Sequence, residues 1–367
     1  MNSKRMFYVL VFLTILSTLL FACAPAPTAA PVGTNEPAEP AQPAESAKKV
    51  VLVGNQRFGD KGPMDDMAAG LDRCASELGL ETKKLESESA AEHEEDLRAM
   101  AREGYDLVIS TFPPMTEPNK VVSAEFPDTK FAAIFQFINV SGVSIPNLWD
   151  TEFHGEAAQY ILGAVAAKLS DSKKIGFING GEEPTPHAEG HGFMMGVRDT
   201  CPECTVEYAV VGSYEDPAKA KEIALAMISN GVDVIQTNAG KSQLGIIEAS
   251  KEKGTLVAGD VSDNVDLHPD GFYGYVGISF GQNVFLACKY LADDNFPGGE
   301  HGIMDLANGG YYIPYPALER FAASSAEHGA KMTEAISLAK DLEAKISAGE
   351  IEVPFITEAP NWSEYEQ

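Results

Sequence analysis

Hydrophobic and polar positions along residues 173–264 follow the pattern of strands that alternate with helices. Apolar runs of four to seven residues are separated by amphipathic stretches of ten or more. This alternation is typical of βα units that build a parallel sheet. The pattern predicts an α/β fold, with strands in the segments 173–181, 205–216, 232–240 and 255–264.

The helix that follows Tyr214 has the clearest predicted boundaries. Asp216 suits the N-cap, and Pro217 suits the first helical position. Apolar side chains then recur every three or four residues, which predicts one buried face, and Gly231 stands just after the last turn. The start, the buried face and the end therefore all agree on a helix.

Polar or glycine clusters end the predicted strands of this region. In open α/β sheets, ligands bind outside the carboxyl ends of the strands. We therefore expect these clusters to line one cleft that holds a small molecule. The clusters lie at 179–181, 212–213, 237–240 and 259–263.

The chain is strongly acidic, with a formal net charge of −27, or −29 once Lys4 and Arg5 are removed with a leader segment. A surface of this charge repels the phosphates of nucleic acids, so we predict no nucleic-acid partner. About 320 residues remain after the N-terminal segments, which is enough for two α/β lobes of ordinary size.

Residues 1–22 have the features of an export signal: a basic start and an apolar run that is short for a membrane-spanning helix. The run leads to Cys23 in a sequence that resembles the lipobox of bacterial lipoproteins. We therefore predict a lipid (palmitate) anchor on Cys23 at the extracytoplasmic face of the cell membrane. The alternative is an ordinary signal peptide whose cleavage discards Cys23. Residues 23–48 are rich in proline and alanine and predict a tether that carries no site.

The remaining cysteines fall into two groups. Cys201 and Cys204 have the spacing of a redox pair, but they stand between a helix end and a strand, so a structural disulfide, free thiols and a redox or metal site all remain open. Cys74 and Cys288 lie on predicted helices with no second ligand nearby, and we interpret them as core residues.

Further elements are expected on both sides of the central region. The segment 271–277 is predicted to be a strand that returns the chain to a first lobe, and 297–310 a hairpin or loop. The other expected elements are strands at 50–55, 105–110 and 130–137, and helices at 65–78, within 85–103, at 155–169, at 282–291 and within 317–346.

Several motifs follow one another in a distinctive order between about residues 49 and 355. They are Asp60-Lys61 with Gly70-Leu71, 153–158 with Gly163 and Ala166, 174–181, Gly192-Phe193 with Gly196, 212–214 with Asp216, 231–235, Ala239-Gly240, and Gly349-Glu350 before Val353-Pro354. In the order and spacing of these motifs the chain resembles the basic membrane protein family of substrate-binding lipoproteins, typified by the purine nucleoside receptor of spirochaetes, within the type I periplasmic binding protein class.

The resemblance implies two Rossmann-like lobes with parallel sheets joined by a hinge. Lobe 1 would contain 49–150 and about 277–310, and lobe 2 would contain 151–276 and about 311–355. Closure on a ligand follows when the ligand binds the closed form more tightly. The implied protein is a monomer that delivers a nucleoside to an ABC permease, with no cofactor and no catalysis.

Some of the family's ligand positions differ in this chain. Pro63-Met64 replace the usual Phe-Asn, and the loop 182–189 has no phenylalanine to stack on a base. The first carboxylate of the segment 259–263 is displaced by one place, and Gly281-Gln282 stand where the family has a lysine. These differences weaken the nucleoside assignment but not the transport role.

Replacement ligand contacts can be proposed from the ends of the predicted strands. Aromatic residues there could stack on a planar ligand, although each could instead be a core residue. Polar residues could accept or donate hydrogen bonds, although the acids could be solvated loop residues, and a glycine allows close approach of the backbone. The candidates are Asn55, Phe58, Asp60, Phe112, Trp149, Asn238, Gly240, Asp260 and Asp263.

Three patterns suggest other chemistry, and we prefer none of them. Ser279 lies in a G-x-S-x-G motif, with Asp305 and His328 downstream as formal partners of a serine hydrolase. The phosphate-loop motif near Lys241 lacks its first glycine. His187 and His191, with the glutamates at 182, 183 and 189, could hold a metal but stand in a proline- and glycine-rich loop, so we predict no metal.

The combined prediction is a lipid-anchored, extracytoplasmic solute receptor of an ABC importer. Two alternatives stay open. The ligand could be a different small solute, such as a base or a sugar, or the bound receptor could signal to a membrane sensor instead of a permease.

Overall fold

The computed structural model describes residues 47–59 and 62–365. The predicted leader, the lipidation site Cys23, the tether up to residue 46 and the ligand candidate Asp60 lie outside these residues. No helix within the described ranges combines the length and the apolar character that crossing a bilayer requires.

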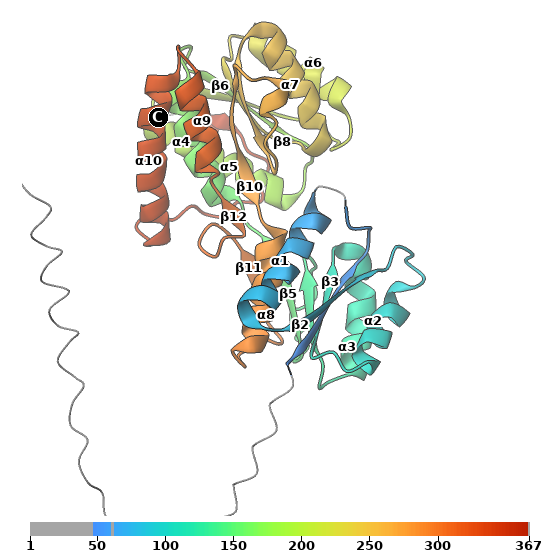
Figure 1. Ribbon diagram of the computed structural model, residues 1–367. Helices are drawn as coiled ribbons and strands as arrows, with labels where there is room; N and C mark the ends of the chain where they lie inside the picture. Colours follow the sequence, from blue (N-terminus) through green and yellow to red (C-terminus); the bar gives the residue numbers. More distant parts are fainter. Residues whose placement is uncertain (1–46, 60–61, 366–367) are drawn as a thin grey trace, which may run out of the picture. The chain divides into compact units, whose positions relative to one another are not determined.

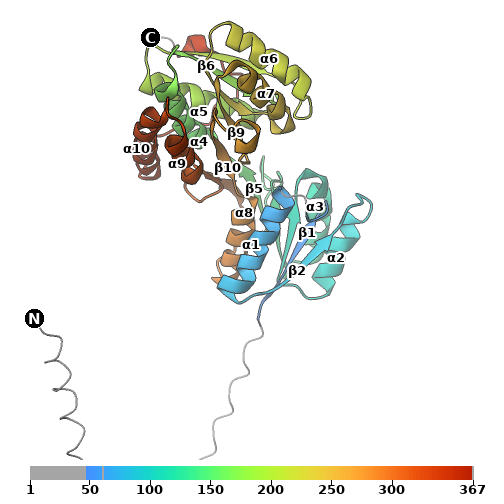
Figure 2. The same cartoon turned by 45° about the horizontal axis from the view of Figure 1, so that its top comes forward.

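The first sheet has six parallel strands in the order β11-β5-β4-β3-β1-β2 (Figure 1). Helices α1 and α8 pack together on one face, and α2 and α3 pack together on the other (Figures 1 and 2). The elements are β1 Lys49–Gly54, α1 Pro63–Leu78, β2 Glu81–Glu86, α2 His93–Arg102, β3 Leu107–Thr111, α3 Thr116–Glu125, β4 Lys130–Ile134, β5 Leu148–Phe153, α8 Phe280–Ala292 and β11 His301–Met304.

The second sheet has the order β12-β10-β9-β8-β6-β7, with β12 antiparallel and the other strands parallel. The elements are α4 Glu156–Leu169, β6 Lys174–Asn179, α5 Pro184–Thr200, β7 Thr205–Val210, α6 Pro217–Ser229, β8 Val234–Asn238, α7 Gln243–Lys253, β9 Leu256–Asp260, β10 Phe272–Ile278, β12 Tyr311–Tyr312, α9 Tyr315–Ser324 and α10 Gly329–Ser347. Short 3-10 turns lie at Pro113–Met115, Gly240–Ser242, Val265–Leu267 and Trp362–Glu364.

These sheets confirm the predicted α/β fold with mostly parallel strands. The central strands β1, β3 and β4 are almost wholly buried, as parallel strands covered by helices on both faces must be. Helix α6 begins as predicted, because the Asp216 carboxylate accepts a hydrogen bond of 3.0 Å from the Lys219 backbone N–H.

Two segments assigned from the sequence differ in the structure, and strands β2, β5 and β12 were not predicted. The strand expected to return the chain to the first lobe is β10, which belongs to the second sheet and pairs with β9, so the return comes after it, where α8 begins. The expected hairpin or loop at 297–310 contains β11, which pairs with β5. Edge strand β2 gave no apolar signal, because most of its Glu and Lys side chains are at least partly exposed.

Four cysteines form two disulfides. The pair Cys201–Cys204 closes the turn after α5, and Cys74–Cys288 joins α1 to α8. Cys74 and Cys288 are core residues, as interpreted from the sequence, but the bond between them was not predicted. Both are fully buried, but the sequence gives no sign that helices 214 positions apart lie side by side (Figure 1).

Helices α4 and α5 pack with unusually close backbones. A Cβ at Gly163 would lie 2.2 Å from the Phe193 carbonyl oxygen, and a Cβ at Gly196 would lie 1.9 Å from the Tyr160 carbonyl oxygen. Only glycine permits this approach. The contact places the N-terminal half of α5 against the strand ends of the second sheet, where the candidate site lies.

Candidate ligand-binding site

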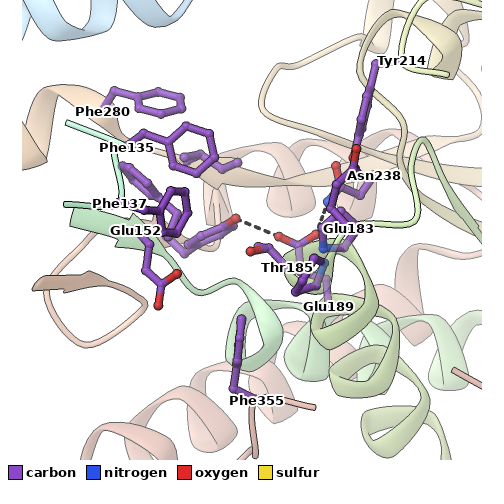
Figure 3. Close-up of a pocket in the computed structure, with 15 residues that line it drawn as sticks. Phe135, Phe137, Glu152, Glu183, Thr185, Glu189, Tyr214, Asn238, Phe280 and Phe355 are labelled. Atoms are coloured by element: carbon purple, nitrogen blue, oxygen red, sulfur yellow. Dashed lines mark hydrogen bonds between the residues drawn. The ribbon is translucent and has the colours of Figure 1, made fainter. Parts of the chain in front are cut away.

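A cavity of about 620 Å³ lies where the carboxyl ends of strands from both sheets meet. Its size lies within the range of roughly 300–1,000 Å³ that is usual for small-molecule sites. Aromatic rings and a few polar side chains line it (Figure 3). The lining residues are Phe135, Phe137, Glu152, Phe153, Glu183, Pro184, Thr185, Pro186, Glu189, Tyr214, Asn238, Ile278, Phe280, Tyr311 and Phe355.

Phenylalanines from the first sheet and α8 form one wall of the cavity. The ring centroids of Phe153 and Phe280 are 4.8 Å apart, and Phe135 lies 5.8 Å from Phe153. Phe112 packs behind them, 5.6 Å from Phe280. Phe112 and Phe135 both have positive φ, 63° and 52°, which is rare for a bulky residue. Such backbone conformations cluster at ligand sites, and here Phe135 lines the cavity while Phe112 lies behind the lining rings.

Glu189 forms the polar part of the opposite wall. Its carboxylate accepts a hydrogen bond of 2.7 Å from the Tyr311 hydroxyl and another from the Asn238 side-chain amide (Figure 3). Glu189 is 1% exposed, and burial raises its pKa to about 7, with the negative charges of Asp260 and Glu156 adding to the increase. The cavity therefore contains a buried carboxyl group that is almost completely shielded from solvent.

Glu152 lies at the other side of the cavity in a network of histidines. Hydrogen bonds from His154 and His301 lower its pKa to about 2. The carboxylates of Asp150 and Glu152 in turn raise the pKa of His301 to about 9. The His301 ring stacks on Phe137, and the His154 ring stacks on Phe355 at 3.8 Å. The network thus positions two of the rings that line the cavity.

This network predicts a pH dependence of stability. The pKa of His301 is higher in the folded chain than the 6.5 of the free side chain, so its ion pairs stabilise the fold below about pH 6.5 and are lost as the pH rises to about 9. We expect His301→Gln to lose about 2 kcal/mol of unfolding free energy at pH 6, after allowance for solvent at the ring, and little at pH 9.5. Urea unfolding at several pH values measures this difference.

His93→Gln is the control for His301→Gln. His93 is buried, but its ring hydrogen-bonds the neutral Ser87 hydroxyl and not a carboxylate. His93→Gln should keep the wild-type decrease between pH 6.5 and 9. An unchanged decrease in His301→Gln would contradict the proposed ion pairs.

Of the ligand contacts predicted from the sequence, Asn238 lines the cavity. Asp260 and Gly240 lie just behind the lining of the cavity, where the Gly240 backbone N–H donates to the Asp260 carboxylate at 3.3 Å. Burial raises the pKa of Asp260 to about 7. Phe112 belongs to the wall described above but lies behind the lining rings.

The other described candidates lie away from the lining. Trp149 is buried in the first lobe and packs edge-to-face on Tyr290. Asp263 forms an ion pair with Arg320. Asn55 hydrogen-bonds Thr111 and so joins the ends of β1 and β3, while the half-buried Phe58 packs on the core.

Sequence reasoning missed most of the residues that line the cavity. Phe135 and Phe137 directly follow strand β4, so the rule that ligands bind at strand ends could have found them. Phe280 follows the end of strand β10 and could have been found by the same rule. Tyr311 and Phe355 gave no such signal, because long-range packing brings them to the cavity.

The three residues that could have formed a serine-hydrolase site have separate structural roles. The Ser279 hydroxyl accepts the Gln282 backbone N–H at the start of α8 and donates to Asp66. Asp305 accepts backbone N–H groups of its own turn, and His328 stacks on Phe321. The hydrogen bonds of the described residues do not link these three side chains.

The two histidines considered for a metal hold the C-terminal segment. His187 donates to the Thr357 carbonyl oxygen, and His191 donates to the Glu358 carbonyl oxygen and accepts from Tyr365. Among residues 47–59 and 62–365, no group of three or more His, Cys, Asp or Glu side chains could hold a metal ion.

The two α/β lobes, with the cavity at their strand ends, have the fold of the periplasmic binding protein class. A solute-binding protein of an ABC transporter system from Aeropyrum pernix has this fold with a TM-score of 0.61, at 24% identity over 87% of this chain and 95% of its own. The arabinose-binding protein of Geobacillus stearothermophilus has a TM-score of 0.55, at 16% identity over 68% of this chain and 88% of its own.

Residues 47–355 match the Bmp family, described as ABC transporter substrate-binding protein PnrA-like, and the chain belongs to this family. Basic membrane protein A of Borreliella burgdorferi is 28% identical over 257 residues, which are 69% of this chain and 75% of that protein. A purine-binding protein of Brucella abortus is 29% identical over 194 residues, which are 52% of this chain and 53% of that protein. The chain is therefore an ABC transporter substrate-binding protein, from a family of binding proteins rather than enzymes.

Proposed function

We propose that this protein binds a nucleoside between its two lobes and delivers it to an ABC permease at the extracytoplasmic face of the cell membrane, where Cys23 carries the lipid anchor. The observation that supports this most is the composition of the cavity. Aromatic rings on one wall suit a planar base, and carboxylates and an amide suit the hydroxyl and N–H groups of a nucleoside.

The carboxylates divide naturally between two parts of such a ligand. Glu152 and Glu183 are less buried than Glu189, and an ionised carboxylate can accept two hydrogen bonds from a ribose diol. Glu189 and Asn238 face the cavity from the deeper wall, where the edge of a stacked base would lie. A free base has no ribose hydroxyls that could reach the remaining lone pairs of these two outer carboxylates, which favours a nucleoside over a base.

Two further observations support the proposal. The relative in Brucella abortus is named a purine-binding protein. The lining residues come from both sheets, so a ligand in the cavity would contact both lobes and favour the closed arrangement. Closure on a ligand is the signal by which a permease can distinguish the loaded receptor from the empty one.

A thermal-shift experiment with guanosine, adenosine and inosine tests the proposal. A nucleoside at 100 times its dissociation constant should add about 2.7 kcal/mol to the free energy of unfolding and raise the melting temperature. Phe137→Ala removes an exposed lining ring and should weaken binding by about 1–3 kcal/mol, the usual value of stacking a base on an aromatic side chain.

Val143→Ala is the matched control for Phe137→Ala, since Val143 is similarly exposed at 48% but does not line the cavity. It should leave binding unchanged. If none of the three nucleosides moves the melting temperature, the nucleoside proposal is wrong.

A further inference from the structure

All the ionisable carboxyl, amino and imidazole groups that line the cavity in the described part of the chain are carboxyl groups. The lining contains the carboxyl groups of Glu152, Glu183 and Glu189, and none of the lining residues in the described part of the chain is Lys, Arg or His. A ligand atom that accepts hydrogen bonds would find few donors here, and an anionic group would meet like charge. The cavity therefore favours ligands that donate hydrogen bonds.

Glu189 determines where those donors must lie. Tyr311 donates to one oxygen of its carboxylate and Asn238 donates to the other, and each oxygen has a second lone pair. Glu189 is only 1% exposed, so water can donate few hydrogen bonds to these lone pairs. Two neighbouring N–H groups of a ligand would satisfy both oxygens and stabilise the ionised carboxylate.

The surroundings of Glu189 reinforce this requirement. Asp260 and Glu156 are both more than nine-tenths buried, and each has a carboxyl oxygen without a hydrogen-bond partner among the described residues. Their negative charges add to the field at Glu189. A lone pair of the ligand placed at Glu189 would therefore be repelled, whereas an N–H group would be attracted.

Among nucleobases, guanine presents the matching edge. Its ring N–H and its 2-amino group are adjacent donors that a carboxylate can bind together, and the neighbouring 6-oxo group can accept the second N–H of the Asn238 amide. Adenine presents a bare ring nitrogen at the central position, and hypoxanthine lacks the 2-amino group. We propose that Glu189 makes this receptor selective for 2-amino-6-oxopurine nucleosides; this inference rests on the proposed nucleoside function.

Dissociation constants of guanosine, inosine and adenosine, measured by calorimetry, test the inference. Wild-type protein should bind guanosine roughly ten- to a hundred-fold more tightly than inosine, and adenosine more weakly still, as expected for a paired hydrogen bond to a base edge. Glu189→Gln replaces one acceptor oxygen by a donor of the same size, so it should remove most of the preference for guanosine over inosine.

Glu183→Gln is the matched control, because Glu183 also lines the cavity but is exposed and bound by the Tyr214 hydroxyl. It should keep the ratio of guanosine to inosine affinity. If inosine or adenosine binds as tightly as guanosine, or if folded Glu189→Gln keeps the wild-type ratio, the inference is wrong while the nucleoside function stands. If no nucleoside binds, the proposed function itself fails. The wild-type ratio decides the question even if the variant does not fold.

Discussion

Removing the disulfide Cys74–Cys288 should lower the free energy of unfolding by about 5 kcal/mol in the double variant Cys74→Ala/Cys288→Ala. The two cysteines are 214 positions apart, so the bond closes a very long loop in the unfolded chain. A long loop restricts the unfolded ensemble strongly, and its release favours unfolding. In the fold, the bond joins α1, near the start of the first lobe, to α8, where the chain returns to that lobe.

The second disulfide gives a matched control. Cys201 and Cys204 are also buried but only three positions apart, so Cys201→Ala/Cys204→Ala should cost about 2 kcal/mol by the same reasoning. Both double variants remove two buried sulfur atoms, so the packing losses are similar. Urea unfolding under oxidising conditions measures both. Equal losses would mean that the long crosslink does not form or does not restrict the unfolded chain.

Gly196→Ala should destabilise the protein by about 3 kcal/mol, at the upper end of the usual cost of overpacking. The new Cβ would lie 1.9 Å from the Tyr160 carbonyl oxygen and 3.1 Å from the Ala164 nitrogen. Both are backbone atoms of α4, so no side chain can rotate away, and α4 and α5 must separate. Because Glu189 is on α5, ligand affinity should fall as well. Chemical unfolding and calorimetry measure the two effects.

The intrinsic preference for alanine in helices acts in the opposite direction to this packing cost. Ala69 is an exposed residue in the interior of α1, and Ala69→Gly should lose up to about 1 kcal/mol. A stabilising effect of Gly196→Ala would therefore show that the two helices can move apart freely. The expected result is a loss at Gly196 despite the better helix former.

The parts of the fold that the sequence predicted are those with local signals. Helix α6 has its cap, its buried face and its glycine end within 16 residues, 216–231, and β6, β8 and β9 are short apolar runs. Edge strands β2 and β12 were not predicted. β2 is charged and β12 contains only Tyr311 and Tyr312, so neither has the alternation that marks a strand.

The candidate site was predictable only where it follows a strand end. Asn238 ends β8, and the rule for open α/β sheets found it. Glu189 was considered only as a metal ligand, because its partners Tyr311 and Asn238 are 122 and 49 positions away in the chain. Phe355 reaches the cavity from the C-terminal segment, which no local pattern places.

The amino-acid sequence by itself determined the α/β class of this protein, its acidic charge and its similarity to a family of substrate-binding proteins, because periodicity, composition and motif order can be read along the chain. The tertiary structure decided which side chains meet in the cavity, which cysteines pair and which carboxyl groups lose their water. Those outcomes depend on how two sheets and ten α-helices of the described chain pack, and packing joins residues that lie far apart along the chain.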